Sequence, residues 1–112
     1  MSVLYTVTAT FSDPSVAQEW EDWMRNGHMQ ALLDCGAERA ELVRWTDSPE
    51  DGGAIHMTAH YRFPSADVLE KYLRDHAGEL REDGLAKFPT SRGIAYARRI
   101  GDVLLPSEST ER

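Results

Sequence analysis

The stretch SVLYTVTATFSDPSVAQEWEDWMRNGHMQALLDCG, residues 2–36, contains two successive patterns that decide the fold. In the first, residues 2–11 alternate between two sets of side chains, and valine, threonine and aromatic residues suit a pleated sheet. One face would carry Val3, Tyr5, Val7, Ala9 and Phe11, and the other Leu4, Thr6, Thr8 and Thr10. The alternation therefore predicts a strand.

The second pattern is an amphipathic helix that begins at Ser12-Asp13-Pro14. Ser12 or Asp13 can accept hydrogen bonds from the free amides of a first turn, and proline is pre-shaped for that turn. Gly36 can take the left-handed conformation that ends a helix. Spacings of three and four then predict one buried helix face. That face comprises Val16, Trp20, Trp23, Met24, Gly27, His28, Ala31 and Leu32.

Two further strands are predicted next in the chain, over residues 38–46 and 54–63, because their side chains again alternate. The residues between them, 47–53, read DSPEDGG. Such acidic, glycine-rich residues form turns, so we expect a mobile hairpin loop there.

A second helix is predicted over residues 64–88, where Pro89 would stop it. Gly78 and Gly84 are expected to allow bends in this helix. Residues 92–100, RGIAYARRI, predict the last strand. The order is then β-α-β-β-α-β, an α+β ferredoxin-like layout with a four-stranded antiparallel sheet and both helices on one face.

Two helices cover only one face of such a sheet, which leaves the other face in water. The candidate apolar residues for that open face are Leu4, Leu42, Ile94 and Tyr96. An exposed apolar face of this size usually marks an interface. We therefore predict a homodimer through the open sheet face, with two-fold symmetry, as in a dimeric α/β-barrel.

Length and charge limit the classes of partner. The 112 residues fit one domain, expected over residues 1–105, followed by a polar tail over residues 106–112. The net charge of −7 disfavours nucleic acid as a partner. No apolar run is long enough for a membrane span, and the first residues lack a secretory signal pattern. The single cysteine, Cys35, is expected to be structural, and we expect a bacterial, cytoplasmic protein.

The segment WEDWMRNGHMQALLDCG, from Trp20 to Gly36, resembles the motif W-x-x-W-M-x-x-x-H-x-x-x-x-L-x-x-G of a bacterial family, domain-of-unknown-function family 4286. Tyr61 and LREDGLAKF, residues 80–88, match two further segments of that family in the same order. One departure is Gln30, where similar members often carry a proline two residues after the histidine. The resemblance implies a ferredoxin-like dimeric α/β-barrel, and it implies no activity.

His28 is the strongest single candidate for chemistry. Its spacing from Trp20 and Met24 places it on the apolar helix face. There it could lie at the mouth of a cavity and move protons near neutral pH. The structural alternative is a histidine whose hydrogen bond fixes the junction between helix and strand.

His56 and His60 lie on one face of the strand predicted over residues 54–63. A strand rises about 3.3 Å per residue, so the two are roughly 13 Å apart and cannot hold one metal ion together. If their face lines a cavity in the dimer, either could act as a general base or orient a bound acid. The alternative is cross-strand pairing with Thr6 or Thr8.

Other ring side chains have two interpretations as well. Tyr5 and Tyr61 are either core aromatics or hydroxyls aimed into a pocket, and Tyr61 is kept as a candidate site residue. His76 fits a packing or capping role. Trp20 and Trp23 fit the core better than a cofactor site.

Three functions follow as hypotheses. The first is a binding or accessory homodimer for a small apolar or aromatic ligand. The second is a cofactor-independent enzyme, such as a cyclase, isomerase or small monooxygenase, which would use His28, His56, His60 and Tyr61. The third is a haem protein with one of the four histidines as axial ligand. We expect no cofactor and no metal, and an enzyme would need a cavity of roughly a few hundred Å³ with converging polar groups.

Overall fold

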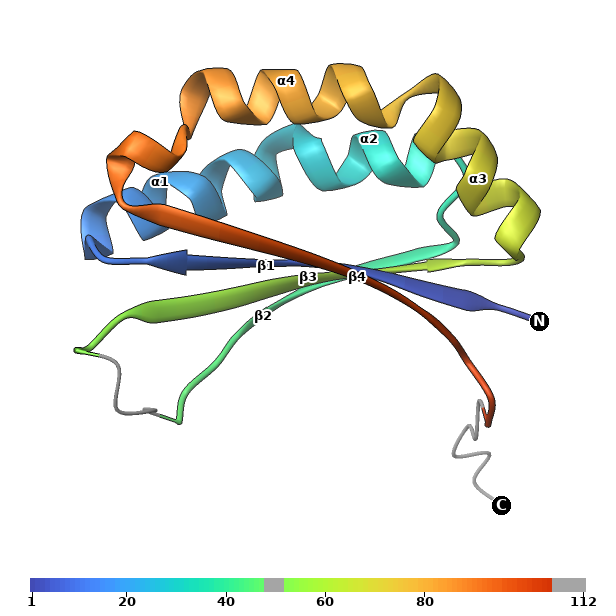
Figure 1. Cartoon of the computed structure of the whole chain (residues 1–112), viewed down its shortest axis with the longest axis horizontal. Coiled ribbons are helices and arrows are strands. Elements are labelled where there is room, and N and C mark those ends of the chain that lie inside the picture. The colour runs from blue at the N-terminus through green and yellow to red at the C-terminus, as the bar shows by residue number, and fades with distance from the viewer. Residues whose placement is uncertain (48–51, 106–112) are drawn as a thin grey trace.

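The computed structural model describes residues 1–47 and 52–105 (Figure 1). The strands are β1 (Val3–Phe11), β2 (Arg39–Arg44), β3 (Ile55–Phe63) and β4 (Ile94–Asp102). The helices are α1 (Pro14–Trp23), α2 (Met29–Asp34), α3 (Ala66–Asp75) and α4 (Ala77–Lys87), with a π-helical turn η1 (Met24–His28) and a 3-10 turn η2 (Thr90–Arg92). The loop predicted over 47–53 lies partly outside the described residues, and the tail predicted over 106–112 lies wholly outside them.

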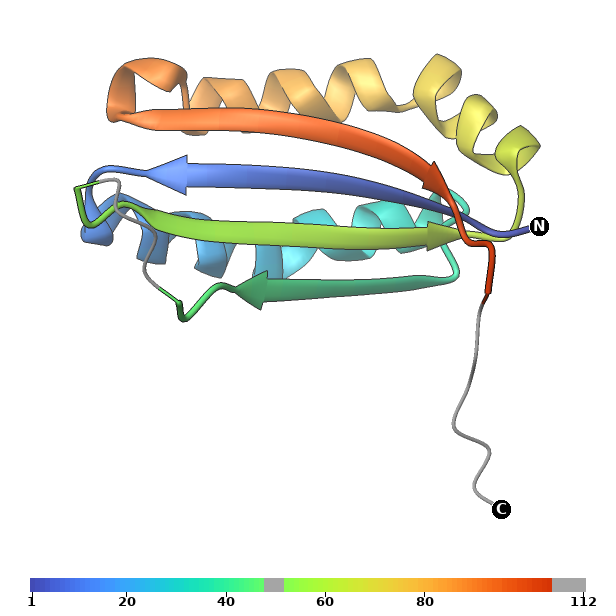
Figure 2. The same cartoon turned by 60° about the horizontal axis from the view of Figure 1, so that its bottom comes forward.

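The strands form one antiparallel sheet in the order β2-β3-β1-β4, and Figure 2 shows the four strands side by side. The helices all lie on one face of that sheet (Figure 1). At the centre of the sheet, Thr8 of β1 lies between Thr58 of β3 and Ala97 of β4. The ferredoxin-like α+β layout predicted from the strand and helix patterns is confirmed.

The core lies between the sheet and the helices. Except for Thr58, which lies on the open face, the buried strand residues alternate toward the helices, as the period of two requires. They include Val3, Tyr5, Ala9, Phe11, Met57, Ala59, Tyr61 and Phe63. Phe11 packs against Trp20 of α1, with ring centroids 5.4 Å apart, and Trp20 is buried as its spacing predicts.

The open face of the sheet differs from the apolar face predicted above. Leu42 pairs with Ala59, Ile94 with Phe11 and Tyr96 with Ala9, and each of these partners faces the helices. Directly paired residues share a face, so Leu42, Ile94 and Tyr96 were assigned to the wrong side. Leu4 does lie on the open face. That face is mainly polar and holds Thr6, Thr8, Thr10, His56, Thr58 and His60.

The first helical segment begins as predicted but is not continuous. Asp13 caps it by accepting a hydrogen bond from the Ser15 amide at 2.8 Å. The helix then breaks at Asn26 and Gly27, where Gly27 has φ +143° and ψ −31°. That conformation is readily adopted by glycine alone, because a Cβ would clash with the backbone. The spacing rule missed this break because it counted Gly27 as one more member of the apolar face.

The second helical segment also breaks, at His76 rather than at the glycines expected to bend it. Ser65 caps α3 by accepting a hydrogen bond from the Val68 amide at 3.3 Å. His76 ends α3 through a 2.9 Å hydrogen bond from its amide to the Tyr72 carbonyl, and it begins α4. His76 is therefore an exposed junction residue. Of the helices described here, none has the length and apolarity to span a bilayer.

Candidate functional site

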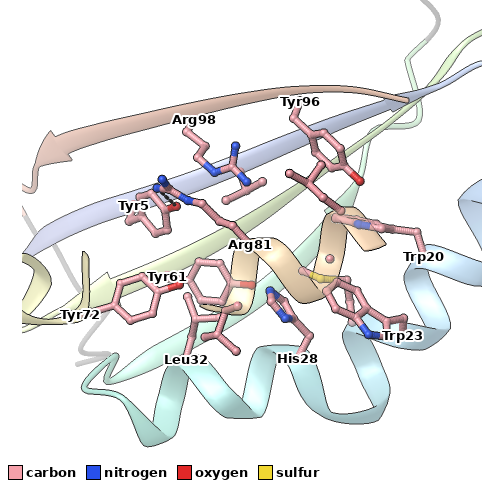
Figure 3. Close-up of a pocket in the computed structure, with 15 residues that line it drawn as sticks. Tyr5, Trp20, Trp23, His28, Leu32, Tyr61, Tyr72, Arg81, Tyr96 and Arg98 are labelled. Atoms are coloured by element: carbon pink, nitrogen blue, oxygen red, sulfur yellow. Dashed lines mark hydrogen bonds between the residues drawn. The ribbon is translucent and has the colours of Figure 1, made fainter. Parts of the chain in front are cut away.

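A cavity of about 50 Å³ lies between the helix-covered face of the sheet and the helices (Figure 3). Its floor comes from β1, β3 and β4, and its other walls come from α1, η1, α2, α3 and α4. The lining is largely aromatic, from Tyr5, Trp20, Trp23, Tyr61, Tyr72 and Tyr96. Within the described part of the chain, no carboxylate lines it.

Three tyrosines form one wall of the cavity. The Tyr5 ring lies 6.1 Å from the rings of both Tyr61 and Tyr72, measured between centroids. Tyr61 is only 1% exposed, and its hydroxyl has no hydrogen-bond partner among the described residues. Burial raises the pKa of Tyr61 well above the ordinary value of 10.0, and the neighbouring Tyr72 and Tyr5 raise it further. The hydroxyl therefore keeps its proton and is available to donate a hydrogen bond.

The π-helical turn η1 brings His28 against Trp23. Five residues advance an α-helix by about 500°, so the two side chains would point roughly 140° apart in a regular helix. Here the Met29 amide bonds to the Met24 carbonyl, which is the wider i→i+5 pattern of a π-turn. The two rings consequently stack, with centroids 4.2 Å apart and 23° between their planes. This turn, rather than the face shared with Trp20, holds His28 at the cavity.

Burial sets the charge of His28. The pKa of the imidazole falls from 6.5 to about 4, chiefly because of burial; the negative charge of Asp83 raises it and the positive charge of Arg98 lowers it. In this view of the cavity, the Tyr61 ring lies between the side chains of Tyr72 and His28 (Figure 3). At neutral pH the site therefore presents an uncharged imidazole and a protonated phenol.

Two arginines lie beside the aromatic cavity, one from α4 and one from β4. Arg81 donates a hydrogen bond to the Tyr5 hydroxyl at 3.2 Å. The Arg98 guanidinium lies 5.9 Å from the centre of the Tyr96 ring, and the Tyr96 hydroxyl donates to the Phe88 carbonyl at 2.8 Å. Both guanidinium groups lie on the sheet side of the cavity in Figure 3. Arg81, Leu85 and Arg98 are the exposed residues of the lining. They mark the entrance of the cavity, which is therefore cationic.

The structure separates the four candidate residues into two groups. His28 and Tyr61 line the cavity. His56 and His60 lie on the open face, where His60 pairs with Thr6 and the His56 Nδ1 atom lies 3.1 Å from the Thr10 hydroxyl. The cavity and the open face lie on opposite sides of the sheet. No group of three potential metal ligands occurs in the part of the chain that the structure describes.

The site residues expected from the sequence do not include Tyr72, Tyr96, Arg81 or Arg98. For Arg98 a signal was present, because it shares the alternation of Ile94 and Tyr96 along the last strand. Its neighbour Arg99 points to the open face opposite Thr6. Arg81 carries no comparable signal, since only the packing of α4 over β1 brings it to Tyr5.

Solved structures with this fold include proteins of several kinds. A dimeric ferredoxin-like protein from an uncultured marine organism aligns with a TM-score of 0.71 and 13% identity, covering 95% of this chain and 98% of that one. An ethyl tert-butyl ether D (EthD) family protein from Bacillus halodurans has a TM-score of 0.64, 16% identity and coverage of 90% and 99%. A putative antibiotic biosynthesis monooxygenase from Nitrosomonas europaea has a TM-score of 0.55, 13% identity and coverage of 95% and 94%. At such identities the likeness concerns the fold alone.

The sequence itself matches one family over most of its length. A comparison with the curated proteins finds no significant match. Residues 2–99 match the family described as a domain of unknown function, DUF4286. The resemblance drawn from the tryptophan-histidine helix motif is confirmed, and the chain belongs to the DUF4286 family.

Proposed function

We propose that this protein is a homodimeric binding domain for a small apolar or aromatic molecule, held in the cavity between the sheet and the helices. The observation that carries the proposal is the Tyr61 hydroxyl, which is buried and has no hydrogen-bond partner among the described residues. An unsatisfied buried hydroxyl costs about 1–3 kcal/mol. A polar atom of a ligand in the cavity would give Tyr61 that partner.

The walls around Tyr61 support an apolar or aromatic ligand. Trp23, Met24 and Leu32 line the cavity beside the tyrosines, so most of the available contact is apolar or aromatic. Aromatic pairs contribute about 0.5–1.5 kcal/mol beyond the area that they bury. A ring or a short alkyl chain would gain most from these walls.

The volume limits the size of this ligand. Sites for drug-sized molecules measure about 300–1,000 Å³, whereas this cavity measures about 50 Å³. The ligand is therefore small, or α4 moves outward when it binds. Within α4, which the structure describes in full, Ala77 is the one buried residue and Leu85 is 47% exposed, so few of its side chains are anchored in the core.

Calorimetry with small neutral ring compounds tests the proposal. Phenol, benzyl alcohol and indole should bind the protein, and tryptophan fluorescence should change because Trp20 and Trp23 line the cavity. Tyr61→Phe should weaken binding of the two hydroxyl-bearing compounds, whereas His60→Gln on the opposite face should not. The proposal would be contradicted if none of these compounds binds and small carboxylic acids such as benzoate and phenylacetate do not bind either.

The homodimer is proposed to form through the open sheet face. The dimeric ferredoxin-like proteins among the similar structures support this arrangement. The face is mainly polar, and the Thr8 and Thr58 hydroxyls are 3.0 Å apart near its centre. Light scattering should give the mass of two chains, and Thr8→Arg should give one. Glu70→Arg, an equivalent change on the exposed surface of α3, should leave the dimer intact. A monomeric wild-type protein at micromolar concentration would overturn this part of the proposal.

The proposed location is the bacterial cytoplasm. The single cysteine, Cys35, supports it, because a lone free thiol needs no oxidising compartment.

A cofactor-independent enzyme is the second candidate function. The observation that favours it is the uncharged imidazole of His28 beside the cavity, next to the Tyr61 phenol. In such an enzyme His28 would accept a proton from an activated C–H bond, and Tyr61 would donate a hydrogen bond to the oxygen that gains charge. A general base works best when its pKa lies near the working pH. The low pKa of His28 therefore makes binding the stronger of the two candidates.

Deuterium exchange distinguishes the two functions. For a ligand that binds and has an acidic C–H bond, an enzyme should speed loss of the C–H signal in deuterated water, measured by proton NMR. His28→Gln should abolish that exchange with little change in binding, whereas His56→Gln and His60→Gln should retain it. Exchange no faster than in buffer would leave binding as the function of the site.

A further inference from the structure

We infer that the ligand of this cavity is a small carboxylic acid, whose carboxylate binds Arg81 and Arg98 at the entrance while its apolar part points inward. The inference rests on the proposed binding function and names the chemical class that the cavity would select. It is carried by the placement of two cationic side chains beside an aromatic cavity that no described carboxylate lines.

The cavity lining carries positive charge, whereas the whole chain is acidic. The protein has a net charge of −7. Most other arginines of the described surface have carboxylate partners, such as Arg44 and Arg25 with Glu21, and Arg92 with Glu19. Within the described residues, Arg81 and Arg98 form no ion pair. Arg81 and Arg98 are the charged side chains among the described residues that line the cavity, so this side of the cavity favours an anion.

The hydrogen-bonding groups at this entrance are mainly donors. A guanidinium has five N–H donors and no acceptor, and its planar edge matches the two oxygens of a carboxylate. Arg81 uses one nitrogen on the Tyr5 hydroxyl and keeps other N–H groups for a ligand. Arg98 is placed by its contact with the face of the Tyr96 ring, which leaves its N–H edge available. The Tyr61 hydroxyl adds a further donor inside the cavity. A group with only acceptors complements this set better than an amide or an amine.

The arrangement also determines which end of the ligand enters. Arg81 and Arg98 are exposed, whereas Trp20, Met24 and Leu32 are buried. A carboxylate at the arginines would keep partial contact with water, which lowers the cost of taking a charge out of solvent. With an interior volume of about 50 Å³, only a short apolar segment fits inside. Short fatty acids and small aromatic acids meet both conditions.

A matched set of acids and amides tests the inference. Butyrate, hexanoate, benzoate and phenylacetate, each paired with its primary amide, would be titrated into the intact protein by calorimetry. The acid of at least one pair should bind about tenfold more tightly than its amide, since hydrogen bonds to charged groups are the stronger ones. Arg98→Gln and Arg81→Gln should each reduce binding of that acid and leave binding of the amide nearly unchanged.

Arg99→Gln is the matched control. Arg99 is the next residue on β4, carries the same charge and faces the open side of the sheet. It should retain the preference for the acid. Because Arg81 and Arg98 are both exposed, their variants should fold, which circular dichroism would verify.

The outcomes separate this inference from the proposed function. If each acid binds no better than its amide, or if Arg99→Gln removes the preference as strongly as Arg98→Gln, the carboxylate inference fails while the binding function stands. If neither acids, amides nor the neutral ring compounds bind, the proposed function fails as well.

Discussion

The two faces of the sheet are made by the same strands, yet they have opposite chemistry. On the helix-covered face, residues such as Tyr5, Ala9 and Tyr61 are at most 3% exposed. On the open face, their neighbours Thr6, Thr10 and His60 are only partly buried, and Thr6 pairs with His60 across the strands while Thr10 pairs with His56. A shift of one residue thus separates a core position from a polar surface position.

This difference teaches where chemistry is available in the molecule. His28 on the covered side is desolvated and uncharged at neutral pH, whereas His56 on the open side lies beside the Thr10 hydroxyl. The covered side also holds the Tyr61 hydroxyl, which has no hydrogen-bond partner in the described part of the chain. The helix-covered face therefore combines the core with the candidate site, and the open face is left for association.

The largest difference between the faces should be seen with two tryptophans. Trp20→Ala should lower the free energy of unfolding by about 3–5 kcal/mol, the usual cost of deleting a buried aromatic, because Trp20 is 3% exposed and packs on Phe11. Chemical denaturation at fixed protein concentration measures it. Trp45, on the open side, is 49% exposed and donates to the Thr58 hydroxyl at 2.8 Å. Trp45→Ala should cost about 1–2 kcal/mol. Equal losses for the two variants would contradict the assignment of the faces.

The next effect concerns pH. The pKa of folded His28 is about 4, below its ordinary value near 6.5, so the unfolded chain binds this proton more readily between those two pH values. His28 should therefore reduce stability as the pH falls from about 6.5 to about 4, by up to about 3 kcal/mol. Unfolding curves across this range should show a shallower pH dependence for His28→Gln than for the wild type.

NMR titration provides the control for that experiment. The imidazole signals of His28 should titrate near pH 4. Arg98→Gln should raise the pKa of His28 and Asp83→Asn should lower it, following the direction in which each charge acts. Arg99→Gln, on the other face of β4, should leave it in place. A His28 that titrates near 6.5 would mean that it does not lie inside the cavity.

A smaller effect should come from the turn that brings His28 to the covered face. Gly27→Ala should destabilise the protein by about 1–3 kcal/mol, because an L-residue is strained at the positive φ of this position. It should also shift the His28 signals, since the stack on Trp23 depends on the turn. Gly78→Ala is the control, because this glycine has ordinary helical geometry in α4 with open space around it. Alanine there should stabilise the protein by up to about 1 kcal/mol. If Gly27→Ala stabilised the protein as Gly78→Ala should, position 27 would not hold the positive φ that favours glycine.

The smallest expected effect distinguishes a bonded from an unbonded tyrosine at the cavity. Tyr61→Phe should leave stability unchanged or raise it by about 1 kcal/mol, because the hydroxyl that it removes has no partner among the described residues. Tyr96→Phe should lower stability by about 1 kcal/mol, since it removes the hydrogen bond to the Phe88 carbonyl. Thermal unfolding of both variants would measure the difference. A clear loss of stability for Tyr61→Phe would mean that its hydroxyl is bonded in solution.

Sequence alone determined the order of elements, the start of the first helix and the burial of Trp20, because these depend on local periodicity and on side chains within a few residues of each other. The sequence also identified His28 and Tyr61 as candidate site residues and showed the resemblance to the DUF4286 family. It could not assign Leu42, Ile94 and Tyr96 to their faces, since each face depends on the register between strands that are distant in the chain.

Only the tertiary structure decided the site. The backbone break at Gly27 turns His28 onto Trp23. The π-turn there holds one residue more than an α-helical turn, and a helical spacing of 3.6 residues does not predict it. The packing of α4 over the sheet brings Arg81 to Tyr5, which lies 76 positions away in the chain. The uncharged state of His28 follows from the same packing, because desolvation is a property of the assembled core. Local sequence patterns therefore determine the helices and strands, whereas long-range packing determines which side chains meet at the cavity and which charge they carry.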